Sequence, residues 1–467
     1  MVEIGSSGPG ASPSVDVGDG YLLYSEAELA DLARAGVARA TALGCDQARV
    51  LVRETAGLSV RASQGEIATS IRDGAALLDV TVFKGGRTGR ATTQALSPAA
   101  IERTVDHAVA IAAALEPDPL AGLADETQLA WTTPAVSLFA PSGLSPSALG
   151  QAALAIERGA LAAAGGQELR ISEAGAASHD SRWALATSQG FCRSGGGSAQ
   201  RRWANAIAQR DNAMETASWS AADRRLGQLM ASEAVGREAA ERAIGKLGAQ
   251  TLSSRRCPVL LDATIADSLV TEIFAALAGR AQVQGQTFIP GAVGQTILPA
   301  HVDLREDPFE PFGLASAVCD SEGVAGARRA VVDAGVVAGL FLSARSGRQL
   351  GRPSTGNADG FSNLALSSRS TAPGDDMAAL WRRMGDGLWL TEFLGGGVNP
   401  VTGAYAKAAA GFWIQGGELA GPVQGFTVAG NLQEMLRDLV AIGSDVHRQG
   451  AIRTGSILLE SLQIAGR

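Results

Sequence analysis

The stretch CPVLLDATIADSLVTEIFAALAG, residues 257–279, combines the pattern of a buried strand with that of a helix. CPVLLD is a short, almost continuous apolar run, which is typical of a strand covered on both faces. An apolar residue then recurs every four positions, at Ile265, Leu269, Ile273 and Leu277. This spacing places the side chains along one face of a helix. A polar stretch, TLSSRR at 251–256, precedes the strand, so we expect a domain boundary there.

Glu272 is a single carboxylate on the second half of this predicted helix. Thr271 precedes it and Ala276 follows it four residues later, and histidine at both positions would make a zinc-protease motif. Positions 271 and 276 point about 140° apart on an ideal helix, because each residue turns it by about 100°. Ala275 is a strong helix former and gives the helix no reason to bend. We therefore predict that Glu272 bonds to a backbone amide or faces a partner, because a lone glutamate lacks the metal that makes hydroxide.

Composition and charge argue against two classes of function. The 467 residues are enough for about two or three domains. A net charge of −8 is not the charge of a typical nucleic-acid binder. No apolar run approaches the roughly 18 residues that would suggest a membrane span. Residues 1–20 lack the pattern of a signal peptide, and the four cysteines form no CxxC pair, so we expect a cytoplasmic protein.

Local signals in the first half predict a sheet with helices. Ser25 and Glu28 form a capping box at the start of a helix. Apolar and polar residues alternate at 58–63 and again at 77–84, as in strands with one buried face. Further elements are expected in five places: helices at 98–115, 145–164 and 231–247, and strands around 182–191 and 202–210.

The second half turns mostly to strand patterns. LWLTEF at 388–393 is strand-like, and AGFWIQGGELAG at 410–421 predicts a hairpin with a two-glycine turn. SILLESLQI at 456–464 predicts a closing strand. A helix capped by Asn431 is expected to run to Gly443.

These patterns predict an α+β fold in two domains, with sheets and helices segregated along the chain. We expect a flexible tail at residues 1–21, an amino-terminal α/β sheet-and-helix domain at 22–250, and a carboxy-terminal β-rich domain at 255–467.

Chemistry-bearing residues give few signals of their own. None of the four histidines lies within five residues of another, so there is no local pair of zinc ligands. His179 and Asp180 could belong to a Ser/His/Asp site at a turn, although serine is common. The glycine runs GGGS at 195–198 and GGGV at 395–398 lack the Lys-Ser/Thr of a phosphate-binding loop.

Two long blocks carry a family resemblance. They are CDSEGVAGARRAVVDAGVVAGLFLSARSGRQLGRPSTGNA at 319–358 and TEFLGGGVNPVTGAYAKAAAGFWIQGGELAGPVQGFTVAGNLQEMLRDLVAIGSD at 391–445. In these blocks and their order the chain resembles the TldD/PmbA family. The resemblance implies a two-domain fold and two kinds of subunit. TldD-like chains carry HExxxH on the helix after a VLLD-like strand, with a later cysteine, whereas TldE/PmbA-like chains lack the motif.

The resemblance assigns the degenerate positions residue by residue. Thr271 and Ala276 occupy the two histidine positions, Glu272 the glutamate position, and Thr454 lies near the cysteine position. We therefore expect no catalytic residue and no metal in this chain. Zinc is expected in a TldD-like metalloprotease subunit that acts with this one on unfolded peptides, in peptide maturation and antitoxin degradation.

The glycine run in the second block suggests a place for a peptide. Glycine lets another backbone approach closely, and an extended peptide can add to an open strand edge. The candidate peptide-binding residues are Gly395, Gly396, Gly397, Asn399 and Tyr405. The glycines could equally serve only as turns. Two other functions stay open, an independently active peptidase with an unrecognised site and a stand-alone peptide-binding scaffold, and the chain could form a homodimer when alone.

Overall fold

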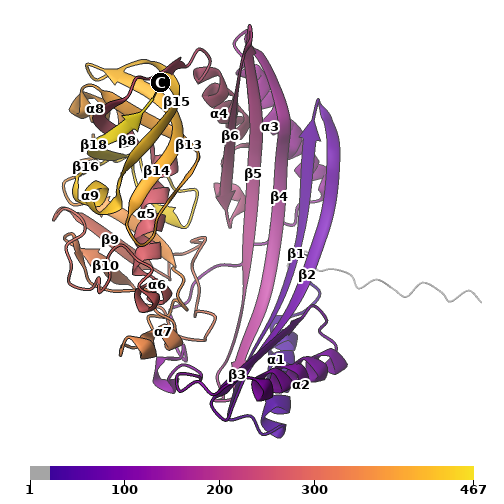
Figure 1. The fold of residues 1–467 in the computed structure, drawn as a ribbon. Coiled ribbons are helices and arrows are strands. Elements are labelled where there is room, and N and C mark those ends of the chain that lie inside the picture. Colours follow the sequence, from indigo (N-terminus) through magenta and orange to yellow (C-terminus); the bar gives the residue numbers. More distant parts are fainter. Residues whose placement is uncertain (1–20, 467) are drawn as a thin grey trace, which may run out of the picture.

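Two halves, each built around β-sheet, stand side by side in the molecule (Figure 1). The structure is a computed structural model, and it describes residues 21–466. The predicted tail at 1–21 therefore lies, apart from Tyr21, outside the described residues.

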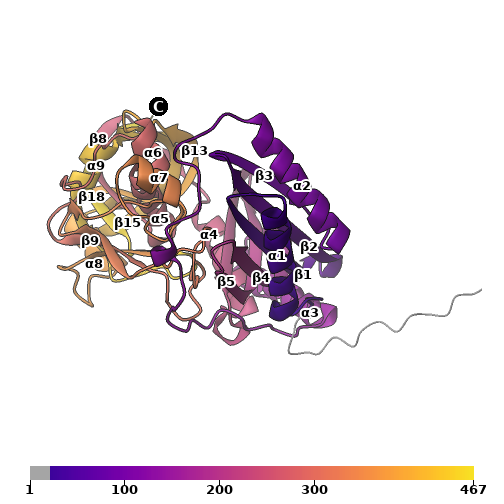
Figure 2. The same cartoon turned by 90° about the horizontal axis from the view of Figure 1, so that it is seen from below.

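The amino-terminal half is a six-stranded antiparallel sheet covered by helices on one face. Its strands, in sheet order, are β3 (Arg87–Thr93), β2 (Glu66–Lys84), β1 (Gln47–Ser63), β4 (Glu168–Thr187), β5 (Cys192–Arg210) and β6 (Ala213–Asp223). Its helices are α1 (Glu26–Ala42), α2 (Pro98–Ala114), α3 (Pro146–Ala162) and α4 (Ser232–Gly245). Every second residue of β1, from Val50 to Val60, is buried on the side of α1, α2 and α3. The opposite face of the sheet looks toward the carboxy-terminal half (Figure 2).

The predicted local signals of this half are confirmed. Ser25 Oγ accepts a hydrogen bond from the Glu28 amide at 3.2 Å, and the Glu28 carboxylate accepts from the Ser25 amide at 2.7 Å. This reciprocal pair satisfies two amides that the first turn of α1 leaves without partners. The strands are longer than their apolar cores suggested, because each continues to pair where its outward residues are polar.

The carboxy-terminal half contains two sheets that share one large apolar core. The seven-stranded sheet runs in the order β16 (Leu439–Ile442), β18 (Ile457–Ala465), β8 (Arg255–Leu261), β13 (Gly387–Val398), β14 (Ala404–Gln415), β15 (Glu418–Asn431) and β7 (Gln250–Thr251). The five-stranded sheet runs in the order β11 (Val336–Val337), β10 (Arg329–Asp333), β9 (Val302–Asp307), β12 (Asn363–Ser368) and β17 (Ile452–Arg453). The helices of the carboxy-terminal half are α5 (Ala263–Leu277), α6 (Gly279–Gln284), α7 (Ala344–Gln349), α8 (Met377–Met384) and α9 (Leu432–Arg437).

The helix of the opening stretch, α5, contacts β13 of one sheet and β17 of the other. Its predicted apolar stripe is confirmed, since Leu269, Ile273 and Leu277 are all buried. Asp262 begins the helix by accepting a hydrogen bond from the Thr264 amide at 3.0 Å. The mixed α+β fold class is confirmed as well.

One predicted boundary is wrong. Asn431 does cap a helix, and its side chain accepts from the Gln433 amide at 2.9 Å. The helix ends at Arg437 instead of Gly443, because residues 439–442 form β16 and pair with β18. That strand pairing is made with residues near the end of the chain, so local helix signals did not reveal it. No helix in residues 21–466 is long and apolar enough to cross a membrane.

Candidate functional site

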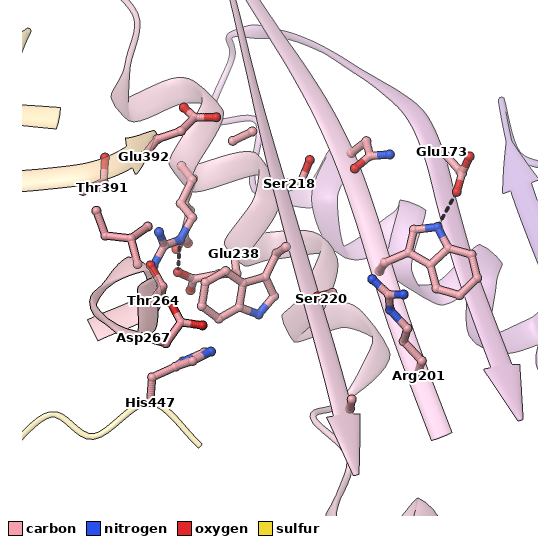
Figure 3. Close-up of a pocket in the computed structure, with 18 of the residues that line it drawn as sticks. Glu173, Arg201, Ser218, Ser220, Glu238, Thr264, Asp267, Thr391, Glu392 and His447 are labelled. Atoms are coloured by element: carbon pink, nitrogen blue, oxygen red, sulfur yellow. Dashed lines mark hydrogen bonds and ion pairs between the residues drawn. The ribbon is translucent and has the colours of Figure 1, made fainter. Parts of the chain in front are cut away.

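A cavity of about 1480 Å³ lies between the two halves. Its amino-terminal wall is the uncovered face of the six-stranded sheet, including the edge strand β6, together with α4. Its carboxy-terminal wall comes from the first half of α5 and from β13, with further side chains from α8, β14, β15 and His447. Figure 3 shows Thr264, Asp267, Thr391, Glu392 and His447 on one side of the strand that carries Ser218 and Ser220, and Glu173 and Arg201 on the other.

Contacts across the cavity tie the two halves together. Lys246 of α4 pairs with Glu392 of β13. The ring of Trp219 on β6 meets the ring of His447 edge-on, with centroids 5.7 Å apart. The Ala222 amide on β6 donates to Gln449 Oε1 at 2.9 Å. These contacts hold the two walls of the cavity in place relative to each other.

Two titratable groups in the cavity are shifted toward their neutral forms. Burial lowers the pKa of His447, although the nearby Asp267 carboxylate opposes this shift. Burial raises the pKa of Asp267, and several hydrogen bonds and charges, His447 among them, oppose that shift. Among residues 21–466 no group of three His, Cys, Asp or Glu side chains is placed to hold a metal ion.

Strand β13 leaves one of its edges free where it borders the cavity. On one side it pairs with β14 from Gly387 to Val398. On the other side it pairs with β8 only from Leu388 to Leu390. From Thr391 onward that second edge has no strand partner in the described part of the chain, and Thr391, Glu392 and Phe393 line the cavity. An unpaired edge of this kind presents backbone donors and acceptors to any extended chain that reaches it.

The three candidate glycines lie on this free edge and differ in role. Gly396 has a φ of 104°, and a Cβ atom there would lie 2.3 Å from the Ala406 carbonyl oxygen. The pairing of β13 with β14 therefore requires glycine at this position. A Cβ atom at Gly395 or Gly397 would meet nothing within 4 Å. The space beside these two residues is open.

The other two candidate peptide contacts are placed differently from each other. Asn399 is exposed and shapes the turn after β13, where its Oδ1 accepts from the Val401 amide at 3.0 Å and the Thr402 amide at 3.1 Å. Tyr405 is 4% exposed and packs edge-on against Phe393, with centroids 6.4 Å apart. Burial, with the added effect of the Glu272 charge, raises the pKa of the Tyr405 phenol. Tyr405 is therefore shielded from solvent and supports Phe393, which lines the cavity.

Glu272 is held by a cation of the chain itself. The Lys407 ammonium lies 3.7 Å from the Glu272 carboxylate, and both side chains are largely buried. The same ammonium lies 5.0 Å from the ring centroid of Phe393 and 5.1 Å from that of Tyr405. A lysine ammonium over an aromatic face is attracted by the negative face of the ring quadrupole. No sequence pattern indicates this pairing, because Lys407 lies on β14, far from α5 along the chain.

The residues at the degenerate positions do not fit a zinc ion. Thr271 is exposed and donates its hydroxyl to the Asp267 carbonyl at 3.0 Å, whereas Ala276 is buried on another side of the helix. Thr454 is buried and donates to the Gly455 carbonyl at 3.1 Å. Zinc prefers thiolate, imidazole or carboxylate ligands, four in a structural site and three plus a water in a catalytic site. This set offers one carboxylate, and an ammonium group already neutralises it.

The Ser/His/Asp site considered at His179 and Asp180 does not form. These residues lie in the middle of β4 instead of at a turn, and as neighbours on a strand they point to opposite faces. Asp180 is buried and accepts from Ser198 Oγ at 2.6 Å. His179 faces the cavity, with its Nε2 3.6 Å from an Asp73 oxygen.

Comparison with known proteins identifies the family. Three family models match the chain: PmbA/TldA metallopeptidase domain 1 at residues 48–112, the central domain at 139–247, and the C-terminal domain at 254–466. Metalloprotease PmbA of Escherichia coli O157:H7 is 34% identical over 430 residues, which cover 90% of this chain and 93% of that protein. A metalloprotease PmbA homologue of Haemophilus influenzae is 33% identical over 449 residues, covering 95% and 98%.

A solved structure agrees with this assignment in its fold. TldE from Thermococcus kodakarensis superposes with a TM-score of 0.78 at 19% identity, covering 93% of this chain and 99% of that protein. The resemblance seen in the sequence is confirmed, and the chain belongs to the PmbA/TldD family of metallopeptidase-like proteins.

Proposed function

We propose that this chain is the metal-free subunit of a TldD/TldE-type protease that cleaves unfolded peptides. A TldD-like chain would supply the zinc ion and the catalytic glutamate. This chain would help to form the chamber in which the substrate is cleaved. It would also hold the substrate in an extended form. Four cysteines that are all free support a reducing compartment, so we place the complex in the cytoplasm.

The ion pair between Glu272 and Lys407 is the observation that supports the proposal best. A catalytic glutamate must accept a proton from metal-bound water, and here an ammonium group lies 3.7 Å from the carboxylate. The neighbouring positions Thr271 and Ala276 carry no group that could bind zinc in its place. Because these positions offer no zinc ligands, we propose that the catalytic set comes from a second chain.

The free edge of β13 supports the peptide-holding role. In strand addition the affinity comes from backbone hydrogen bonds, which every peptide can make. This mode of binding therefore suits unfolded peptides of varied sequence. The edge opens onto a cavity that is large enough for an extended segment with its side chains. Maturation of precursor peptides and degradation of antitoxins are processes that present such segments.

Co-expression with a TldD-like chain tests the assembly. We expect the two chains to elute together in size exclusion, because obligate interfaces usually bury more than about 2,000 Å². Zinc analysis after dialysis should find metal in the complex and none in this chain alone. Separate elution at micromolar concentration, or tight stoichiometric zinc in this chain alone, would contradict the proposal.

The variant Glu272→Gln tests which chain carries the catalysis. In the reconstituted complex it should leave peptidase turnover largely intact, since it removes no catalytic group. The matched control is the same change at the motif glutamate of the TldD-like chain, which should abolish turnover. A loss of about a hundredfold or more from Glu272→Gln, with assembly unchanged, is the scale of a true acid–base group and would overturn the proposal. Peptidase activity of the pure chain would instead support an independent enzyme.

A further inference from the structure

Three aromatic side chains form a continuous wall beside the start of the free edge. We call Trp381 of α8, Trp389 of β13 and Phe412 of β14 the aromatic wall. The rings of Trp381 and Trp389 have centroids 5.1 Å apart, and those of Trp389 and Phe412 stack with centroids 5.0 Å apart and planes inclined by 27°. All three rings line the cavity, and none is fully buried.

The wall lies on a defined face of the sheet. Trp389 and Phe412 are direct cross-strand partners, so their side chains share one face. Their neighbours Leu388 and Trp413 are also partners and share the other face, where they pack in the main core. Trp389 is oriented by a hydrogen bond from its Nε1 to Asp262 Oδ2 at 3.2 Å. The wall is therefore held in place before any ligand arrives.

The wall is within reach of a strand added at the free edge. That edge begins at Thr391, two residues after Trp389. Side chains of an added strand alternate between the faces, and direct neighbours on one face lie about 4.5–5.5 Å apart. Phe393 lines the cavity too but packs against the main core, so the cavity is lined from both sides of β13.

We propose that the cavity takes an aromatic side chain of the bound peptide, phenylalanine, tyrosine or tryptophan, against the aromatic wall. This inference rests on the proposed peptide-holding function and names its preferred substrates as extended peptides with an aromatic residue. Aromatic rings attract one another at centroid distances of about 4.5–7 Å beyond the effect of area alone. That attraction corresponds to a preference of about threefold to tenfold over an aliphatic residue.

Two peptides that differ only at their central residue test the preference for an aromatic side chain. Both are short fluorescent peptides of Ala, Ser and Thr, one with a central Phe and one with a central Leu, and binding to the full chain is followed by fluorescence anisotropy. We expect the Phe peptide to bind about threefold to tenfold more tightly. Phe412→Leu should bring the ratio close to one. The matched control Trp413→Leu changes the next residue of the same strand on the opposite face, and should keep the ratio.

Each outcome bears on the inference. Equal binding of the two peptides to the natural chain, or an equal loss of preference in Trp413→Leu, would overturn it while leaving the peptide-holding function standing. Binding of neither peptide would overturn that function and the inference with it. If Phe412→Leu fails to fold, Trp381→Leu serves instead, since the Trp381 indole nitrogen makes no hydrogen bond with the described residues.

Discussion

The same three-glycine run occurs in two strands of this molecule, with opposite surroundings. Gly195–Gly197 lies in β5 and is covered by the chain itself. The Ser198 amide donates to the Leu138 carbonyl at 3.0 Å, and a Cβ atom at Gly196 would lie 2.9 Å from the Phe139 ring. Gly395–Gly397 lies in β13, and on its free edge no part of the described chain covers it.

The difference shows what a glycine in a strand can and cannot indicate. Glycine there marks a bulge, a tight bend or a place where something approaches the backbone closely. At the first run the approaching segment is residues 138–140 of the same chain, so the glycines serve the fold. At the second run we infer that the approaching segment is another polypeptide. Alanine variants at these positions separate the glycines that the fold needs from those it does not.

The largest effect is expected inside the open run, at Gly396. Alanine there would have to adopt a φ of 104° with its Cβ 2.3 Å from the Ala406 carbonyl oxygen. Such strain costs about 3 kcal/mol, because a backbone oxygen in a paired strand cannot move away cheaply. Urea denaturation of Gly396→Ala should show this loss in the free energy of unfolding. A loss below about 1 kcal/mol would mean that β13 and β14 are less rigid here than the structure shows.

Next in size is the loss of the cation that faces Gly396 across the sheet. Lys407 is the cross-strand partner of Gly396, and Lys407→Met leaves the Glu272 carboxylate without its ammonium partner. We expect a loss of about 2 kcal/mol, because both groups are largely shielded from water. The double variant Lys407→Met with Glu272→Gln should recover part of it. No recovery in the double variant would show that the two side chains are not coupled.

A smaller loss is expected at Gly196 in the covered run. Its Cβ atom would approach the Phe139 ring at 2.9 Å and the Ser181 carbonyl oxygen at 3.2 Å. The ring can shift, so Gly196→Ala should cost about 1 kcal/mol in urea denaturation. Peptide affinity, measured by anisotropy, should stay unchanged, since this run lies away from the free edge. A fall in affinity with normal stability would remove the distinction between the two runs.

The smallest effect on stability is expected at Gly397. A Cβ atom there would meet nothing within 4 Å, and the residue does not require a positive φ. Gly397→Ala should therefore change the free energy of unfolding by less than about 0.5 kcal/mol. A loss above about 1 kcal/mol would indicate that part of the chain covers this position in solution.

The sequence predicted features that depend on neighbouring residues. The capping box of Ser25 and Glu28 and the two-glycine hairpin between β14 and β15 were readable because each signal is complete within a few residues. The end of α9 could not be predicted from the sequence, because the strand β16 that follows it forms only by pairing with β18.

The cavity and its contents could not be predicted for the same reason. Trp219 and His447 meet across the two halves, and Glu272 meets Lys407 through the placement of β14 against α5. One local signal for the aromatic wall did exist. Trp389 and Phe412 lie in stretches already identified as strands, but their register, which decides that they share a face, was not fixed by the residues alone.

Hydrogen exchange with mass spectrometry tests the central claim, that the open glycine run is the edge that holds a peptide. The full chain is exchanged with and without a saturating amount of the Phe-containing peptide. We expect slower exchange within residues 391–398 when the peptide is present, because an added strand takes up the outward amides of β13. Residues 195–198 should exchange at the same rate in both samples. Protection in neither run, or protection of 195–198 alone, would contradict the claim.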